Sequence, residues 1–143
     1  MSVEETLANV QLFSELQKDD LERLAKVTMT REYKAGDVIV REGDIGVAFY
    51  IVAKGTVEVV KGLGTGTEQV LATMGPEEFF GEMSLLDDEA RSASVRAKED
   101  TECLVLTKWD FNAELASSPA LTQSMFSALA RRIREINNDA PTH

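Results

Sequence analysis

The stretch FFGEMSLLDDEARSASV, residues 79–95, places Arg91 just beyond three consecutive acids. Gly81 follows a phenylalanine pair, and residues 82–86 have the length of little more than one helical turn between two predicted strands. A short helix that starts after a glycine presents unpaired backbone N–H groups, which bind phosphate readily. The stretch therefore predicts an anion-binding cradle inserted into a β structure.

The charged residues of this stretch have two interpretations each. Arg91 either forms a surface ion pair with one of the acids at 87–89, worth at most about 1 kcal/mol, or turns its guanidinium inward to meet phosphate oxygens in fork geometry. Glu82 is either a first-turn acid favoured by the helix dipole or a carboxylate that accepts hydrogen bonds from sugar hydroxyls. Spacing alone favours the surface pair for Arg91. The combination of a glycine-led helix start, a carboxylate and an arginine favours a ligand site.

Short apolar stretches separated by turn residues surround the stretch on both sides. They predict strands at 37–40, 48–53, 56–60, 69–74, 93–97 and 102–106. Many short strands with regular turns are typical of a mainly β jelly-roll barrel, here of about eight strands. Lys54-Gly55 predicts a tight hairpin between two of them. The glycine-rich segment 61–67 lacks the Gly-Lys-Ser/Thr ending of a phosphate-binding loop, so a hairpin tip is the better interpretation.

Helices are predicted on both sides of the barrel. Apolar spacing predicts short helices within 3–27 and a helix at 108–116, and Ser118-Pro119 supplies an N-cap and a first-turn proline for a longer helix to about residue 138. We therefore expect one domain over 1–143, with helices at 1–29, the barrel at 30–107 and helices at 108–138. The last helix carries a stripe that either packs on its own domain, forms a dimer seam or acts as a mobile lid: Leu121, Met125, Leu129, Arg132, Ile133 and Ile136.

Composition limits the function. The chain has 143 residues and a net charge of −10, which argues against a nucleic-acid or anionic-membrane partner. Cys103 is the single cysteine and lies in an apolar run, so we expect a soluble protein of the reducing cytoplasm. His143 is the single histidine, so neither a metal-dependent jelly-roll enzyme nor a histidine-activated nucleophile is expected. We expect no catalytic activity and no cofactor.

Residues 81–86 followed by 91–95 resemble the phosphate-binding cassette of cyclic nucleotide-binding domains, a family that includes catabolite activator-type regulators, protein kinase regulatory subunits and cyclic nucleotide-gated channels. Further motifs in the family's order lie at 34–39, 42–44, 49–52, 55–57 and 74–80, so the resemblance covers about residues 8 to 138. It implies a jelly-roll sensor domain that binds cyclic AMP or cyclic GMP. Only five residues follow Asn138, so we expect a stand-alone module without a helix-turn-helix DNA-binding domain.

The resemblance also implies roles for individual residues. Glu82 would accept the ribose 2′-hydroxyl, and Arg91 would pair with the exocyclic phosphate oxygens. The full predicted phosphate and ribose set is Gly81, Glu82, Met83, Ser84, Arg91, Ser92 and Ala93. Ser92 would bond the phosphate or a guanine edge, or it is a plain strand residue. The base pocket and lid would be formed by Val70, Ala72, Met74, Arg132, Ile133, Ile136 and Asn137, with core packing as the competing interpretation for the first three.

Two departures from the family pattern are expected to be tolerated. Glu77 stands where the family often has glycine, in the turn after Gly75-Pro76, and the polar tip 87–90 stands where proline frequently precedes the arginine. We expect a signalling module that binds a cyclic mononucleotide, moves its C-terminal helix and acts on a further protein, with a homodimer through that helix as one arrangement. The alternative is a barrel that has lost its ligand and serves as a protein-interaction scaffold.

Overall fold

The computed structural model describes residues 2–81 and 90–139, and the chain divides into two compact units. The β unit comprises Val27–Asn112, and the helical unit comprises Met1–Lys26 together with Ala113–His143. Each unit has its own internal packing.

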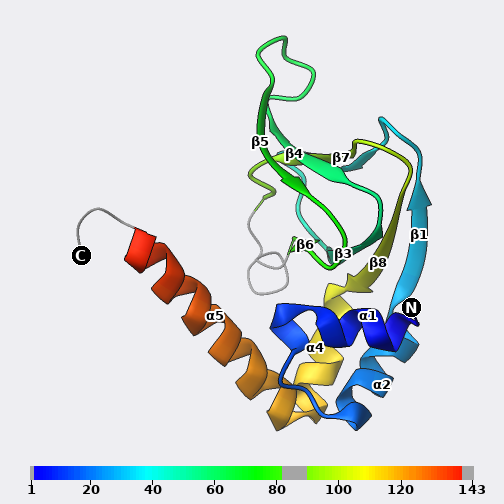
Figure 1. Cartoon of the computed structure of the whole chain (residues 1–143), viewed down its shortest axis with the longest axis vertical. Helices are drawn as coiled ribbons and strands as arrows, with labels where there is room; N and C mark the ends of the chain where they lie inside the picture. Colours follow the sequence, from blue (N-terminus) through cyan, green and yellow to red (C-terminus); the bar gives the residue numbers. More distant parts are fainter. Residues whose placement is uncertain (1, 82–89, 140–143) are drawn as a thin grey trace. The chain divides into compact units, whose positions relative to one another are not determined.

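Across the described residues, the β unit consists of eight strands in two four-stranded antiparallel sheets (Figure 1). The first sheet has the order β1-β8-β3-β6 and the second the order β2-β7-β4-β5. The strands are β1 Met29–Tyr33, β2 Val38–Val40, β3 Ala48–Lys54, β4 Val57–Lys61, β5 Gln69–Met74, β6 Phe79–Phe80, β7 Ser94–Ala97 and β8 Thr101–Thr107. Most steps along the chain pass from one sheet to the other. This is the jelly-roll arrangement, so the predicted fold class is confirmed.

Both sheets contribute to the core of the β unit. Val52 and Phe80 come from the first sheet, Val57 and Val95 come from the second, and all four are buried in one cluster. Burial of such a side chain contributes about 1.5–3 kcal/mol, so the cluster is a major part of what holds the two sheets face to face.

The connection at Lys54-Gly55 is not the predicted hairpin. It links β3 in the first sheet to β4 in the second, so it is a corner between the sheets. Gly55 has φ 90°, and a Cβ added there would lie 2.5 Å from the Asp100 carbonyl oxygen and 2.8 Å from the Thr101 Cα. A tight hairpin and a tight corner both demand a glycine with positive φ, so the local sequence does not distinguish them. The predicted hairpin between β4 and β5 is confirmed by their antiparallel pairing.

The prediction missed two strands, β1 and β6. The residues of β1 are mostly exposed, and Arg31 and Glu32 in its centre hide any apolar alternation, yet the strand pairs with β8 along its whole length. Strand β6 has only two residues, Phe79 and Phe80, which pair with Ile51 and Tyr50 of β3. Pairing partners distant in the sequence define both strands, which is why their own residues gave little signal.

The turn at Glu77 keeps the shape that glycine would allow. Glu77 adopts φ 72°, its N–H donates to the Val52 carbonyl over 2.8 Å, and Glu78 N–H donates to the Gly75 carbonyl over 3.1 Å. A left-handed conformation costs a non-glycine residue about 1–2 kcal/mol. The sequence departure at Glu77 is therefore absorbed as local strain with the turn intact.

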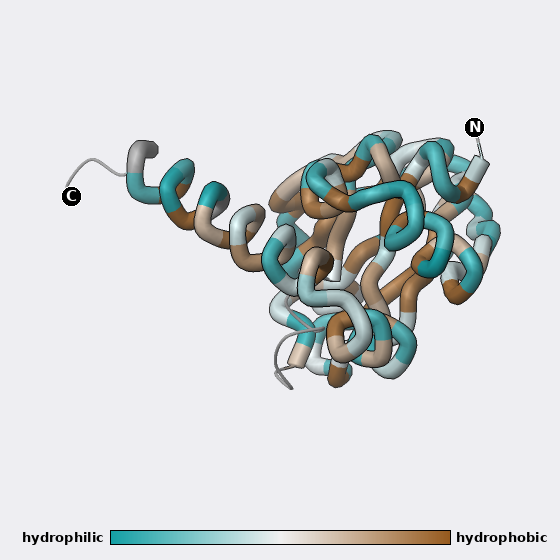
Figure 2. Tube along the Cα trace, turned by 90° about the horizontal axis from the view of Figure 1, so that it is seen from below, coloured by the Kyte–Doolittle hydropathy of each residue, from teal (hydrophilic) through white to brown (hydrophobic). Residues whose placement is uncertain are grey.

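The helical unit contains short helices at the N-terminus and a long one at the C-terminus. They are α1 Val3–Asn9, the 3₁₀ helix η1 Gln11–Phe13, α2 Lys18–Val27, α4 Lys108–Ser117, whose first half belongs to the β unit, and α5 Pro119–Asp139. Figure 2 shows hydrophobic and hydrophilic residues alternating along α5. Leu121, Met125 and Ala128 of this helix are buried, and α5 contacts η1. None of the described helices combines the length and the apolar character needed to cross a bilayer.

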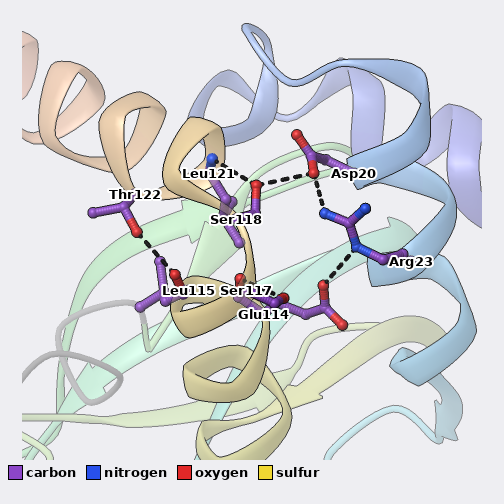
Figure 3. A network of polar contacts seen from close by, with 8 residues as sticks. All are labelled: Asp20, Arg23, Glu114, Leu115, Ser117, Ser118, Leu121 and Thr122. Carbon is purple, nitrogen blue, oxygen red and sulfur yellow. Dashed lines mark hydrogen bonds and ion pairs between the residues drawn. The ribbon is translucent and has the colours of Figure 1, made fainter.

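A polar network joins α2 to the junction of α4 and α5 (Figure 3). Ser118 Oγ accepts a hydrogen bond from Leu121 N–H over 3.2 Å, which confirms the predicted N-cap. The same hydroxyl donates to Asp20 Oδ1 over 2.9 Å, and Asp20, only 7% exposed, also pairs with Arg23. Arg23 Nε then donates to Glu114 Oε2 over 3.2 Å. Ser118 thus both starts α5 and ties it to α2.

We predict that Ser118→Ala destabilises the protein by about 1–3 kcal/mol, because it removes a helix cap and takes a partner from a buried carboxylate. Urea unfolding followed by circular dichroism measures this loss. The control is Ser117→Ala, since the exposed Ser117 hydroxyl only donates to the Glu114 carbonyl of its own helix. Equal loss in the two variants would contradict the role given to the network.

Candidate functional site

The centre of the candidate site is the close approach of Arg91 to Gly81. Gly81 directly follows β6 and has φ 85°. A Cβ added to Gly81 would overlap Arg91 Nη1 and would lie 3.0 Å from the Ala48 carbonyl oxygen. Glycine is therefore required here twice, for its backbone conformation and for the space that the guanidinium occupies.

Arg91 is fixed at both its backbone and its side chain. Its N–H donates to the Asp44 carbonyl over 2.7 Å, and its carbonyl accepts from Gly43 N–H over 2.9 Å. An isolated antiparallel bridge between Ile45 and Ala90 continues this pairing. Arg91 Nη2 donates to the Ala48 carbonyl over 2.7 Å, which engages one of the five N–H donors of the guanidinium.

Two aromatic rings lie beside the guanidinium. Tyr50 stacks on Phe80 with ring centroids 4.9 Å apart and an interplanar angle of 4°. The Arg91 Cζ lies 6.0 Å from the Tyr50 ring centroid, at the outer limit of a cation–π contact. Burial raises the pKa of the Tyr50 hydroxyl, and the nearby charge of Arg91 opposes that rise. Arg91 is therefore held between a backbone carbonyl, a glycine and an aromatic wall.

The segment after Arg91 is held from the outside. Lys61 Nζ donates to the Ser92 carbonyl over 2.7 Å, and Ser94 Oγ accepts from Glu42 N–H over 2.9 Å. Ser92 is exposed, Ala93 is half-buried and Ser94 is buried as the first residue of β7. The segment thus leads from the arginine to β7 along a path fixed by the Lys61 side chain and the Glu42 backbone N–H.

The structure brings part of the predicted phosphate set together. Gly81 and Arg91 are in contact, and Ser92 and Ala93 continue from Arg91. Glu82, Met83 and Ser84 lie outside the described residues, as do the acids at 87–89 that form the alternative partners of Arg91. These roles therefore stay predictions. Tyr50 was missed, because a tyrosine within an apolar strand looks like a core residue.

The predicted base pocket and lid residues lie on β5 and α5. Met74 is half-buried and packs against the same core cluster as Tyr50, whereas Val70 is 46% exposed and Ala72 is also exposed. On α5, Ile133 is 59% and Ile136 68% exposed, Asn137 is exposed too, and the side chain of Arg132 is not described. Their contact with a base stays a prediction.

Cys103 is buried within β8. Burial raises the pKa of the Cys103 thiol to about 12, and the nearby Glu102 adds to the rise, so this thiol stays protonated at neutral pH. Within residues 2–81 and 90–139, no three His, Cys, Asp or Glu side chains are grouped so as to hold a metal ion.

The jelly-roll unit sets the half-buried Arg91 against Gly81 at the end of β6, an arrangement suited to an anionic ligand. The chain belongs to the cyclic nucleotide-binding domain family, whose model matches residues 30–118.

Individual relatives agree with this assignment. The chain is 41% identical over 124 residues to the cyclic AMP receptor protein of Thermus thermophilus, covering 87% of this chain and 57% of that protein. It is 34% identical to human cGMP-dependent protein kinase 2, covering 90% of this chain and 17% of the kinase. Among solved structures, the N-terminal domain of a transcriptional regulator from Streptomyces coelicolor A3(2) matches with a TM-score of 0.83 and 31% identity over 93% of both chains. The chain thus spans little more than half of the first relative and a sixth of the second.

We predict that Gly81→Ala destabilises the protein more than Gly36→Ala does. Both glycines have positive φ, so each alanine adds about 1–2 kcal/mol of backbone strain. At Gly36, however, nothing lies within 4 Å of an added Cβ, whereas at Gly81 the new atom must displace Arg91 or the Ala48 carbonyl. Urea unfolding of the two variants measures the difference, and an equal loss of stability would show that Arg91 and Gly81 are not in close contact.

Proposed function

We propose that the protein is a sensor module that binds a cyclic mononucleotide, cyclic AMP or cyclic GMP, in the β unit. The observation that carries this proposal is the contact between Arg91 and Gly81. This contact places the positively charged guanidinium beside the Gly81 backbone. The exocyclic oxygens of a cyclic phosphate carry one negative charge, so they would pair with the guanidinium at this position. Membership in the family and the names of the relatives support the same ligand class.

The anchoring of Arg91 supports a phosphate role because protein contacts orient the side chain. A guanidinium that is already held by the Ala48 carbonyl loses less conformational freedom when it pairs with an anion. In this proposal Glu82 accepts the ribose 2′-hydroxyl, and the amides of Met83, Ser84 and Ala93 complete the phosphate cradle.

The base would lie against Tyr50 and Met74, which share the core cluster, with Val70 and Ala72 at the outer end of the wall. The names of the relatives include both a cyclic AMP receptor and a cGMP-dependent kinase, and Ser92 suits either purine. Base preference is therefore an outcome of titration rather than part of the proposal.

Signalling would pass through α5. The C-terminal half of α5 offers Ile133, Ile136 and Asn137, with Arg132, as candidates to cover the base. A ligand shifts a conformational equilibrium only by binding one state better than the other, so covering the base is what would couple binding to α5. The downstream protein that α5 would act on is a separate question, and a second copy of the chain is one candidate. We place this activity in the cytoplasm, since Cys103 is a free thiol.

We predict that isothermal titration detects binding of at least one of cyclic AMP and cyclic GMP, and that Arg91→Glu weakens it by more than about 100-fold. The reversed charge would face the phosphate. Arg41→Glu is the control, because Arg41 is exposed near the same loop and makes the same change in net charge.

The outcome distinguishes the two candidate functions. Absence of heat and of a thermal shift at millimolar ligand, for both nucleotides, would contradict the proposal and favour the alternative of an interaction scaffold without a ligand. In that case Arg91→Ala would leave binding unchanged and would alter thermal stability little. Equal weakening by Arg41→Glu and Arg91→Glu would reduce the role of Arg91 to general electrostatics.

We predict that Ile136→Ser lowers affinity for the complete nucleotide about threefold to tenfold, while affinity for ribose 3′,5′-cyclic phosphate, which lacks the base, stays unchanged. A lid residue contacts the base and not the phosphate. Phe126→Ser is the matched control, since Phe126 is 65% exposed on the same helix but is not a candidate lid residue. Equal effects on both ligands, or an equal effect of Phe126→Ser, would contradict a lid at Ile136.

A further inference from the structure

We propose that Glu42 and Lys61 are positioning residues of the nucleotide phosphate site, acting through the Ser92 peptide group rather than by touching the ligand. The inference rests on the proposed function, because it concerns how the segment that follows Arg91 is held for an anion.

The contacts form a closed ring around this segment. Lys61 Nζ donates to the Ser92 carbonyl over 2.7 Å and pairs with Glu42 Oε2 over 3.3 Å. The other carboxylate oxygen, Glu42 Oε1, accepts from Gly62 N–H over 3.1 Å, and Glu42 N–H donates to Ser94 Oγ. The start of β7 is thereby tied to the 42–44 turn and to the end of β4. The residue after Glu42, Gly43, hydrogen-bonds the Arg91 carbonyl, so the ring adjoins the backbone anchor of the arginine.

The bond from Lys61 fixes the direction of one amide. In a trans peptide the C=O and the following N–H point in opposite directions. Because Lys61 holds the Ser92 carbonyl, the Ala93 N–H is turned away from Lys61. In the proposed function the Ala93 N–H donates to the phosphate, so Lys61 would orient this donor from the opposite edge of the same peptide group. Glu42 in turn holds Lys61, and the Gly62 N–H, with help from Lys61, keeps the pKa of the Glu42 carboxyl below its usual value.

The loop between β4 and β5 ends in another carboxylate, Glu68, which serves as an internal reference. Glu68 Oε1 accepts from Gly64 N–H over 3.0 Å, and Glu68 Oε2 pairs with Arg96 over 3.3 Å. The pKa of the Glu68 carboxyl is lowered first by the Gly64 N–H, as that of Glu42 is by Gly62. Arg96 also pairs with Glu58, and neither it nor Glu68 is bonded to the Ser92 carbonyl. Glu68 therefore matches Glu42 in charge and loop contact but differs in its connection to the site.

For the substitution Glu42→Gln, an effect of charge alone and an effect of positioning predict opposite changes in nucleotide affinity. Glu42→Gln keeps an oxygen for Gly62 N–H but removes a negative charge, so general electrostatics would strengthen binding of an anionic nucleotide. If Glu42 acts by holding Lys61 on the Ser92 carbonyl, the same substitution weakens binding.

The experiment is isothermal titration of the full chain with cyclic AMP and cyclic GMP, for the wild type, Glu42→Gln, Glu68→Gln, Lys61→Met, Lys61→Arg and the double variant Glu42→Gln/Lys61→Met. We expect Glu42→Gln to weaken binding about threefold to tenfold and Lys61→Met at least as much, with the double variant no worse than Lys61→Met alone. Lys61→Arg keeps the donor and the charge, so it should retain affinity within about twofold, and Glu68→Gln should not weaken binding at all.

Each outcome decides the question. Three results would overturn the inference. The first is that Glu42→Gln binds the nucleotide as well as the wild type or better, and the second is that the losses of affinity add in the double variant. The third is that Glu68→Gln weakens binding as much as Glu42→Gln does. If the wild type binds neither nucleotide, the proposed function itself fails, which is a separate result. Should a variant fold poorly, the ¹⁵N–¹H signal of Ala93 in ligand-free Lys61→Met and Lys61→Arg replaces the titration. A shift in Lys61→Met that Lys61→Arg restores supports positioning, and an unchanged signal in Lys61→Met overturns it.

Discussion

The placement of the Arg91 guanidinium against the Gly81 backbone and the Ala48 carbonyl is the constraint on which the candidate site depends. It requires three segments to meet: the end of β6, the start of β3 and the strand segment before β7. The jelly-roll order supplies this meeting, because β6 pairs with β3 while β7 lies in the facing sheet. Aromatic stacking between Tyr50 and Phe80 adds an apolar contact between the same two strands, β3 and β6. Fold and site are thus set by the same pairing.

Much of the fold follows from local patterns in the sequence. The predicted bounds agree within a few residues for strands that are buried along most of their length, such as β3 and β8, and for helices with clear caps, such as α5 at Ser118. The elements that escaped prediction have no strong local preference. Strand β1 is held by pairing with β8, and the corner at Gly55 uses the same backbone conformation as a hairpin. In both cases the deciding partner is distant in the sequence.

The contact between Gly81 and Arg91 lies within the one stretch, residues 79–95, that the sequence singles out as a candidate site. Spacing alone favours a surface ion pair for Arg91, and it is the combination of a glycine, a carboxylate and an arginine within residues 79–95 that favours a ligand site. Tyr50, Glu42 and Lys61 do not stand out, since each resembles an ordinary strand or surface residue until folding brings it beside residues 91–94. Single residues acquire a role there only through tertiary contacts.

The bond between Ser118 and Asp20 has a consequence for the order of folding. The two residues are 98 positions apart in the chain, and the β unit lies between them. Closing a flexible loop of that length would cost about 4 kcal/mol in chain entropy. Once it has formed, the pairing of Met29 with Val105 within the β unit shortens the loop greatly, because it holds residues 29 and 105 together. During synthesis from the N-terminus, α2 therefore meets its partner Ser118 only after the whole β unit, residues 27–112, has been made.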